Sequence, residues 1–252
     1  MKMIRTCTNL YAALSMALAW LAIPMTSIAA DAVLHSRSGA WAGQAYTGQR
    51  PVAVTLLLTE TSNKLAGKLH FGSPRNCELR IKQISRTEDL ALFSADDSNG
   101  GSFCNALLTR QIAMQGAASE ATATLSLGDQ GDVSLMRAEQ YAKLPIDATW
   151  ERTSTDGPAI ALTVSLDASR PGGDAGTWSY AGVRRCNLAL EYAGSYGDSE
   201  YLAFRRSNGG LCNQFLDGYA RLTVGDDGTL GYSLFSDGNG LLESGVLRRA
   251  GY

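Results

Sequence analysis

The sequence has few of the residues on which most active sites and metal centres depend. Only two histidines occur in 252 residues, and none of the five cysteines forms a Cys-x-x-Cys motif. His70 corresponds to Ser179 in the internal repeat described below, so a repeated histidine-dependent active site is excluded. The sequence therefore predicts no metal centre and no cofactor.

Other catalytic patterns are incomplete. Ser195 lies in Ala193-Gly-Ser-Tyr-Gly197, which lacks the first glycine of a nucleophile elbow and precedes a strand-like segment instead of a helix. Acidic side chains such as Asp226 and Asp227 lie in expected turns, and a glycosidase pair would need two of them to converge in space. Calcium binding by Asp226 and Asp227, or by Asp237, is an alternative. Neither of these two turns fits the twelve-residue calcium-binding loop. No catalytic residue is predicted, and an enzyme of unrecognised type is kept as an alternative.

Long apolar runs are also missing, except near the first residue. Lys2 and Arg5 precede an apolar run over residues 10–23, and small residues follow it. This pattern predicts a secretory signal peptide over residues 1–30. The run is shorter than the roughly 20 residues that span a bilayer, and no later segment is longer, so no transmembrane span is expected after the signal is removed. The expected location is the periplasm or the extracellular space.

The charge balance argues against two classes of partner. The 22 Lys and Arg residues include the two in the predicted signal peptide, whereas all 24 Asp and Glu residues follow it. The remaining chain therefore carries a net charge of about −4, which gives no electrostatic basis for binding nucleic acid or an anionic membrane.

An internal repeat organises the rest of the chain. A shift of 109 residues places Trp41 on Trp150 and Phe71 on Tyr180, and many turn residues match at the same shift. We interpret this as a tandem duplication. The predicted segments are a first domain over 36–139, a linker over 140–147 and a second domain over 148–252.

Each copy carries its own pair of cysteines. Four cysteines outside the signal peptide allow three pairings, and an exported chain favours disulfides over free thiols. The repeat favours Cys77–Cys104 and Cys186–Cys212, because each copy then closes by itself.

The local pattern predicts an all-β fold. Short alternating segments are separated by turn residues every eight to twelve positions. About eight strands are expected in the first copy, including one around Leu107 and a turn at the Ser-Asn-Gly-Gly sequence that both copies share. We expect two antiparallel meanders in tandem that form barrels, with a sandwich as the alternative.

The order of motifs is similar in both copies. A Trp near the first strand is followed by Gly-x-[Leu/Trp]-x-[Phe/Tyr], a Cys with alternating apolar residues, Asn-Gly-Gly and a second Cys. This order resembles small lipocalin-like β-barrel modules of bacterial envelope and secreted proteins. The resemblance implies a binding role and no catalytic residue.

One difference between the copies bears on binding. Asp96 and Asp97 precede the first Ser-Asn-Gly-Gly turn, whereas Arg205 and Arg206 precede the second. The exchange is either drift at a solvated position or a divergence of loops that contact each other or a partner. The candidate binding residues are Asp96, Asp97, Asn99, Arg205, Arg206 and Asn208.

These observations favour an exported, non-catalytic binding protein. The preferred version is a periplasmic inhibitor or immunity-type protein whose partner is an envelope-directed enzyme such as a cell-wall hydrolase. The alternative is a carrier of a glycan or lipid, with a barrel cavity lined in the second copy by Trp178 and Tyr180. The oligomeric state is not predicted.

Overall fold

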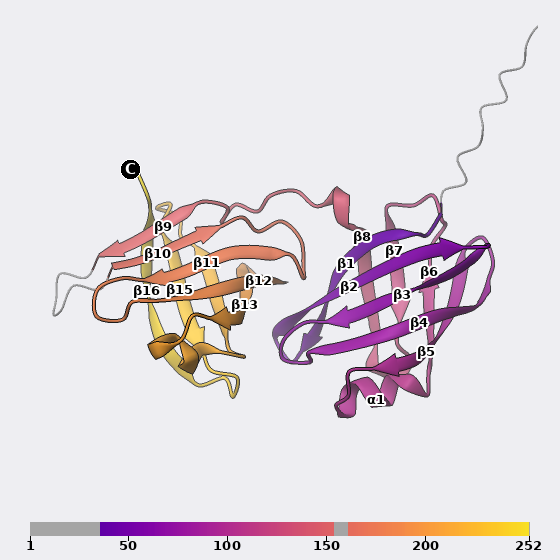
Figure 1. Ribbon diagram of the computed structural model, residues 1–252. Coiled ribbons are helices and arrows are strands. Elements are labelled where there is room, and N and C mark those ends of the chain that lie inside the picture. The colour runs from indigo at the N-terminus through magenta and orange to yellow at the C-terminus, as the bar shows by residue number, and fades with distance from the viewer. Residues whose placement is uncertain (1–35, 154–160, 252) are drawn as a thin grey trace, which may run out of the picture. The chain divides into compact units, whose positions relative to one another are not determined.

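The computed structural model describes residues 36–153 and 161–251 (Figure 1). The predicted signal peptide over residues 1–30 lies outside the described residues. Among the residues described, no helix is both long and apolar enough to cross a lipid bilayer.

The first half of the described chain is a closed antiparallel barrel of eight strands, in which β1 pairs with β8 (Figure 1). Its strands are β1 (Gly39–Thr47), β2 (Arg50–Thr61), β3 (Lys64–Phe71), β4 (Cys77–Arg86), β5 (Leu90–Ser98), β6 (Gln111–Gln115), β7 (Thr122–Ser126) and β8 (Asp132–Arg137). Three short helices accompany them: α1 (Ser102–Leu108), η1 (Gly128–Gln130) and η2 (Ala138–Gln140).

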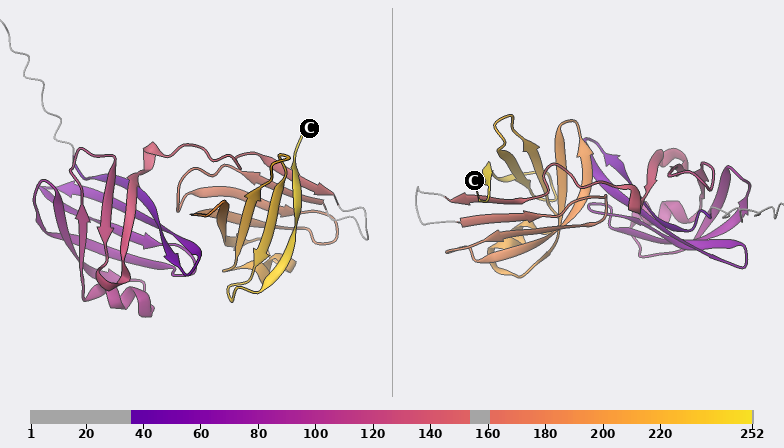
Figure 2. Two further views of the ribbon diagram at one scale, coloured as in Figure 1. Left: turned by 180° about the vertical axis from the view of Figure 1, so that it is seen from behind. Right: turned by 90° about the horizontal axis from the view of Figure 1, so that it is seen from above.

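The second half repeats this architecture, and β16 pairs with β9 to close the barrel (Figure 2). Its strands are β9 (Thr149–Thr153), β10 (Ala161–Leu166), β11 (Asp174–Tyr180), β12 (Cys186–Tyr196), β13 (Ser199–Ser207), β14 (Tyr219–Val224), β15 (Leu230–Phe235) and β16 (Leu241–Arg249). The short helix η3 (Gly210–Phe215) follows β13. The prediction of two tandem β-barrels is confirmed, and so is one disulfide within each, Cys77–Cys104 and Cys186–Cys212.

Alternating side chains fill both barrels. In β2, for example, Val54, Leu56 and Leu58 are almost fully buried, whereas Leu57 between them is 52% exposed. This two-residue period places every second side chain in the barrel interior. Each barrel therefore has its own core cluster of aliphatic and aromatic residues.

The repeated glycine of the Gly-x-[Leu/Trp]-x-[Phe/Tyr] motif allows two strands to approach closely. A Cβ atom on Gly67 would lie 1.9 Å from the carbonyl oxygen of Leu57, and one on Gly176 would lie 2.0 Å from that of Ser165. Any side chain at these positions would overlap the neighbouring strand. The motif is thus a packing requirement of the barrel wall.

The segment after the first Ser-Asn-Gly-Gly sequence differs from the prediction. The strand expected around Leu107 is helix α1, and the sixth strand is β6, which begins at Gln111. Gly100 and Gly101 have φ of 94° and 86°, so the chain leaves β5 without a tight hairpin. Leu107 is still fully buried, because the helix covers one end of the core.

A tryptophan and an arginine meet across the first and last strands of each barrel. The guanidinium of Arg137 lies 4.4 Å from the ring centre of Trp41, and that of Arg249 lies 5.6 Å from Trp150. Both indoles also donate a hydrogen bond to the carbonyl four residues earlier. These contacts are cation–π interactions that join the strands at which each barrel closes.

The two barrels differ at the residue that accepts this indole hydrogen bond. Arg37 in the first barrel is 3% exposed and donates to the carbonyls of Thr87, Glu88 and Gly116, which lie in two loops. The second barrel has Ile146 there, fully buried in its core although it falls in the predicted linker 140–147. The same position therefore holds a buried charged side chain in the first barrel and a buried apolar side chain in the second.

Candidate functional site

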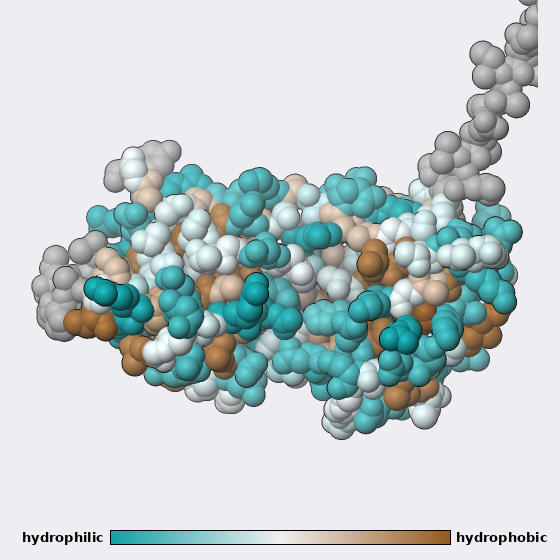
Figure 3. Space-filling model, viewed as in Figure 1, coloured by the Kyte–Doolittle hydropathy of each residue, from teal (hydrophilic) through white to brown (hydrophobic). Residues whose placement is uncertain are grey.

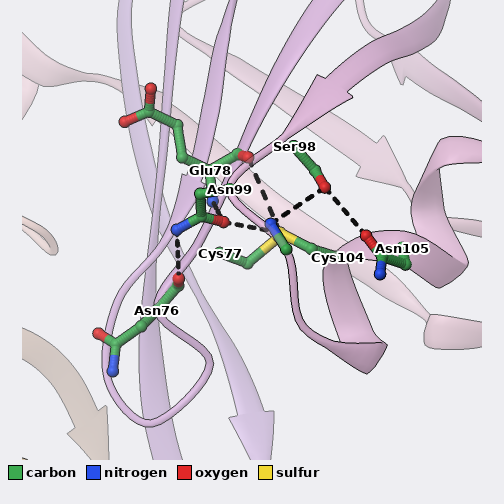
Figure 4. The surroundings of a disulfide bond; sticks show 8 residues. Asn76, Cys77, Glu78, Ser98, Asn99, Cys104 and Asn105 are labelled. Atoms are coloured by element: carbon green, nitrogen blue, oxygen red, sulfur yellow. Dashed lines mark hydrogen bonds between the residues drawn. A yellow bond between two sulfur atoms is a disulfide. The ribbon is translucent and has the colours of Figure 1, made fainter.

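The two Ser-Asn-Gly-Gly sequences fix the disulfide end of each barrel. Asn99 accepts a hydrogen bond from the backbone N–H of Glu78 at 2.9 Å, and its amide donates to the carbonyl of Asn76 at 2.8 Å (Figure 4). Asn208 accepts in the same way from the N–H of Asn187, at 2.8 Å. Each asparagine thus attaches its turn to the strand that begins at the first cysteine.

Replacing Asn99 or Asn208 with alanine is expected to lower the free energy of unfolding by about 1–2 kcal/mol, because backbone groups lose their partners. Urea denaturation measures this change. Asn213 is exposed in η3 and provides the control, for which alanine is expected to be nearly neutral. Equal midpoints for all three variants would contradict the structural role.

The charged residues before the two turns lie on the outer walls of their own barrels. Asp96 pairs with Lys82, and a carboxylate oxygen of Asp97 lies 3.4 Å from Arg80, in both cases between β4 and β5. In the second barrel Arg205 pairs with Glu191 at 3.2 Å between Nε and Oε2. Arg206 is exposed on β13. The change from Asp96 to Arg205 is therefore accompanied by a matching change on the neighbouring strand, from Lys82 to Glu191.

A role of these residues in binding stays a prediction.

A polar cluster lies inside the second barrel, at the end that carries the disulfide. The carboxylate of Glu243 on β16 accepts a hydrogen bond from Tyr180 at 3.1 Å and one from Tyr232 at 2.9 Å. Arg184 pairs with the same carboxylate, and Arg152 on β9 donates to the Tyr232 hydroxyl at 2.6 Å. These five residues, Arg152, Tyr180, Arg184, Tyr232 and Glu243, are called the mouth cluster below.

The two tyrosines of the mouth cluster are shielded from water. Tyr180 and Tyr232 are each 3% exposed, and burial together with Glu243 raises the pKa of Tyr232 to about 12. Burial is also the main reason that the pKa of Tyr180 lies far above its ordinary value. Both phenols are therefore neutral hydrogen-bond donors at physiological pH.

Trp178 lies against this cluster with its polar atom unused. Its ring meets that of Tyr232 at 71° with centroids 5.2 Å apart, and its indole N–H is near enough to the Tyr180 hydroxyl to oppose part of the rise in the pKa of Tyr180. Trp178 is fully buried, and within the described residues its Nε1 has no hydrogen-bond partner. Buried donors without a partner are uncommon in native proteins.

Arg75 of the first barrel corresponds to Arg184, but three other members of the cluster have no polar counterpart there. The strand ladders place Arg152 where the first copy has Gly43, Tyr180 where it has Phe71, and Tyr232 where it has Leu125. Tyr180 and Tyr232 are buried in the barrel, and Arg152 contacts Tyr232. The second copy has therefore acquired an arginine and two hydroxyls in a place that the first copy keeps apolar or small.

Gly245 gives the mouth cluster its space. A Cβ atom on Gly245 would lie 2.6 Å from a terminal nitrogen of Arg152 and 2.9 Å from the Tyr232 hydroxyl. The ladder pairs Gly245 with Tyr232, as it pairs Val133 with Leu125 in the first barrel. The change from valine to glycine and the change from leucine to tyrosine therefore compensate each other in volume.

Exposed apolar side chains lie in the connections at the same end of the second barrel. They are Val183 (74% exposed), Leu211 (45%), Leu241 (59%) and Leu242 (43%), and they are called the apolar rim below. They come from three connections at this end of the barrel: the β11–β12 turn, η3 and the start of β16. Figure 3 shows hydrophobic side chains reaching the surface where the β11–β12 turn lies.

Two open hollows lie at loops away from the disulfides. One of about 400 Å³ lies beside the β6–β7 loop and β8, and one of about 510 Å³ lies beside Asp227, Thr229 and Arg249. Asp227, which the sequence offered as a calcium ligand, accepts hydrogen bonds from the N–H and the hydroxyl of Thr229. Across residues 36–153 and 161–251, no group of three or more His, Cys, Asp and Glu side chains could hold a metal ion.

No protein-family model matches the chain, and no curated protein or solved structure matches it either.

Sequence comparison of the copies found only part of the mouth cluster. The constant shift of 109 aligns Trp178 and Tyr180 with apolar residues, and it also aligns Arg152 with Gly43. It misses Tyr232 and Glu243, because the ladders require a shift of 107 at Tyr232 and 112 in β16. Insertions in the turns hide these two residues until the strands are paired.

Proposed function

We propose that the chain is an exported, non-catalytic binding protein that docks on a partner protein of the cell envelope through the apolar rim of its second barrel. The partner class is the one that the sequence suggested, an envelope-directed enzyme such as a cell-wall hydrolase, which would make this an inhibitor or immunity-type protein. The observation that carries the proposal is the group of exposed apolar side chains around one barrel end.

The filled interior supports docking by loops over carriage of a ligand. A glycan or lipid carrier would need room beside Trp178 and Tyr180. Both side chains are instead packed among aromatic rings, because Trp178 meets Phe204 edge to face at 6.5 Å and Tyr180 stacks on Phe215 at 6.0 Å. Binding at the surface is then the simpler use of this barrel end.

Comparison of the copies supports the choice of surface. Leu211 corresponds to Phe103 in the first barrel, since each precedes the second cysteine of its copy. Phe103 is only partly exposed, packs edge to face on Phe71 at 5.0 Å and is covered by Arg75. Leu211 is exposed instead, so the second copy presents an apolar residue that the first copy folds inward. Exposed apolar groups with a polar surround are typical of protein contact sites.

The two disulfides fit an oxidising, non-cytoplasmic compartment. Periplasmic or secreted location is part of the proposal and rests on the apolar run over residues 10–23 in the sequence. A partner in the cell envelope would share this compartment.

A photo-cross-linking residue placed at Val183 in living cells tests the proposal, with the same residue at Ile84 as control. Ile84 is 52% exposed on β4 of the first barrel, so it matches Val183 in character and lies outside the rim. We expect one specific protein adduct from position 183 and none from position 84.

The cross-linked partner is then purified and titrated with variants. Val183→Ser and Leu241→Ser together are expected to weaken its binding at least about tenfold, because both remove central apolar contacts. Ile84→Ser is expected to leave the affinity and the melting temperature unchanged. Equal adducts at both positions, or unchanged affinity of the rim variant, would refute docking at the rim.

A further inference from the structure

We propose that the mouth cluster is a recognition site for a carboxylate group carried between apolar groups. The inference rests on the proposed function in using the same end of the second barrel. It adds the chemistry of the contact. The apolar groups of the ligand contact the apolar rim, and its carboxylate contacts the mouth cluster.

The charge of the cluster favours an anion. It contains two guanidinium groups, Arg152 and Arg184, and one carboxylate, Glu243, which Arg184 and both tyrosines already engage. Within the described part of the chain, Arg152 donates to a neutral phenol, the hydroxyl of Tyr232. The half-buried guanidinium of Arg152 is thus the cation of the cluster that an incoming anion would stabilise most. Its planar fork of N–H donors matches the two oxygens of a carboxylate.

The unused indole of Trp178 is a second and independent observation. The buried indole N–H lies near the Tyr180 hydroxyl, but among the described residues it makes no hydrogen bond of normal geometry. When a carboxylate draws on the donors of the cluster, the two tyrosine hydroxyls can reorient, and the indole gains an acceptor. The indole N–H therefore reports on occupation of the site.

The selection of ligand follows from the surface above the cluster. Leu241 begins β16 two residues before Glu243 and is 59% exposed, and the pairing of β15 with β16 is irregular between these two residues. Val183 lies in the turn that also holds Arg184. A ligand that approaches the cluster from this end of the barrel therefore meets exposed apolar side chains, which favours a carboxylate with apolar neighbours over a small hydrated anion.

Two sources share this chemistry, an acidic side chain in an apolar segment of a protein and a free carboxylate whose apolar chain stays on the rim outside the filled barrel. The test uses both in separate titrations of the mature protein, observed through its indole N–H resonances. One probe is hexanoate, with hexanamide as its neutral control. The other is a peptide with one glutamate between leucines, with glutamine in the same place as its control.

The indole signals supply their own internal reference. Trp41 and Trp150 donate to backbone carbonyls, whereas Trp178 has no such bond within the described part of the chain. We expect the Trp178 resonance to move and saturate with the carboxylate probes and to stay in place with the neutral controls. The Trp41 and Trp150 resonances should stay in place throughout.

Two substitutions with opposite effects separate recognition from stability. Arg152→Gln is expected to weaken binding of the carboxylate about tenfold, because the charge-assisted contact is lost. Glu243→Gln is expected to strengthen it several-fold, because a competing negative charge is removed. If Glu243→Gln does not fold, Tyr232→Phe replaces it as the second variant. Tyr232→Phe is expected to weaken binding, because Arg152 loses the hydroxyl that orients it.

The outcomes distinguish this inference from the proposed function. Saturable shifts with hexanoate alone would assign the site to a free carboxylate, and stronger shifts with the peptide would assign it to a protein segment. Equal response to carboxylate and amide, or an Arg152→Gln variant that binds as wild type, would overturn the inference. If the cross-linked partner still binds through the rim in that case, only the carboxylate site is refuted.

Discussion

Gly67→Ala is expected to lower the free energy of unfolding by about 3 kcal/mol, since the added methyl group forces two hydrogen-bonded strands apart. The collision is with the backbone: the Cβ atom would lie 1.9 Å from the carbonyl oxygen of Leu57. Gly176→Ala should cost more, because Gly176 also has φ of 101°, where a side chain is strained. Urea denaturation followed by tryptophan fluorescence measures both.

Gly231 supplies the control for this experiment. It lies within β15, and the nearest atom to an added Cβ is 3.5 Å away, which is an ordinary contact. Gly231→Ala is expected to change the midpoint little. If Gly67→Ala and Gly231→Ala unfold at the same urea concentration, the close approach of β2 and β3 is not a requirement of the fold.

Removing the disulfide of the second barrel by Cys186→Ser with Cys212→Ser is expected to cost about 3.5 kcal/mol, as the chain-entropy model gives for a loop of this size. The two cysteines are 26 residues apart, and those of the first barrel are 27 apart, so the same loss is expected for Cys77→Ser with Cys104→Ser. The measurement is again the denaturation midpoint, under non-reducing conditions.

The effect should be confined to the barrel that is changed. Each disulfide joins two segments of one barrel, and each barrel has a separate core cluster. Hydrogen exchange resolved by residue is expected to accelerate in β9–β16 for the Cys186 and Cys212 variant and to stay slow in β1–β8. Uniform acceleration in both barrels would contradict their independence.

The fold was predictable because its determinants repeat. Each barrel has a glycine where two strands approach closely (Gly67 or Gly176), a cysteine at the start of its fourth strand and a tryptophan on its first strand. Because the chain contains two copies, each of these residues appears twice in the sequence. The helix at Leu107 was not predicted, because a buried leucine fits a strand and a short helix equally well. Only the positive φ of Gly100 and Gly101 decides between them.

The candidate site was less predictable for a different reason. Glu243 and Tyr232 belong to β16 and β15, and they approach Tyr180 of β11 only through closure of the barrel. Nothing in their local sequence marks them as partners of Arg152 or of each other. The conspicuous charged residues, Asp96, Asp97, Arg205 and Arg206, lie on outer walls instead.

The pairing of first with last strand determines how much of the chain must be synthesised before each barrel can close. Once the chain has been synthesised as far as Arg137, all eight strands of the first barrel are present. The first barrel can therefore close while the following residues are still being synthesised. The second barrel keeps two unpaired edges, on β9 and β15, until β16 arrives with Arg248 and Arg249. Open edges of this kind pair readily with other chains. The interval before β16 docks is therefore the period in which this chain is most exposed to aggregation, and the first barrel, already closed, offers no edge to the second.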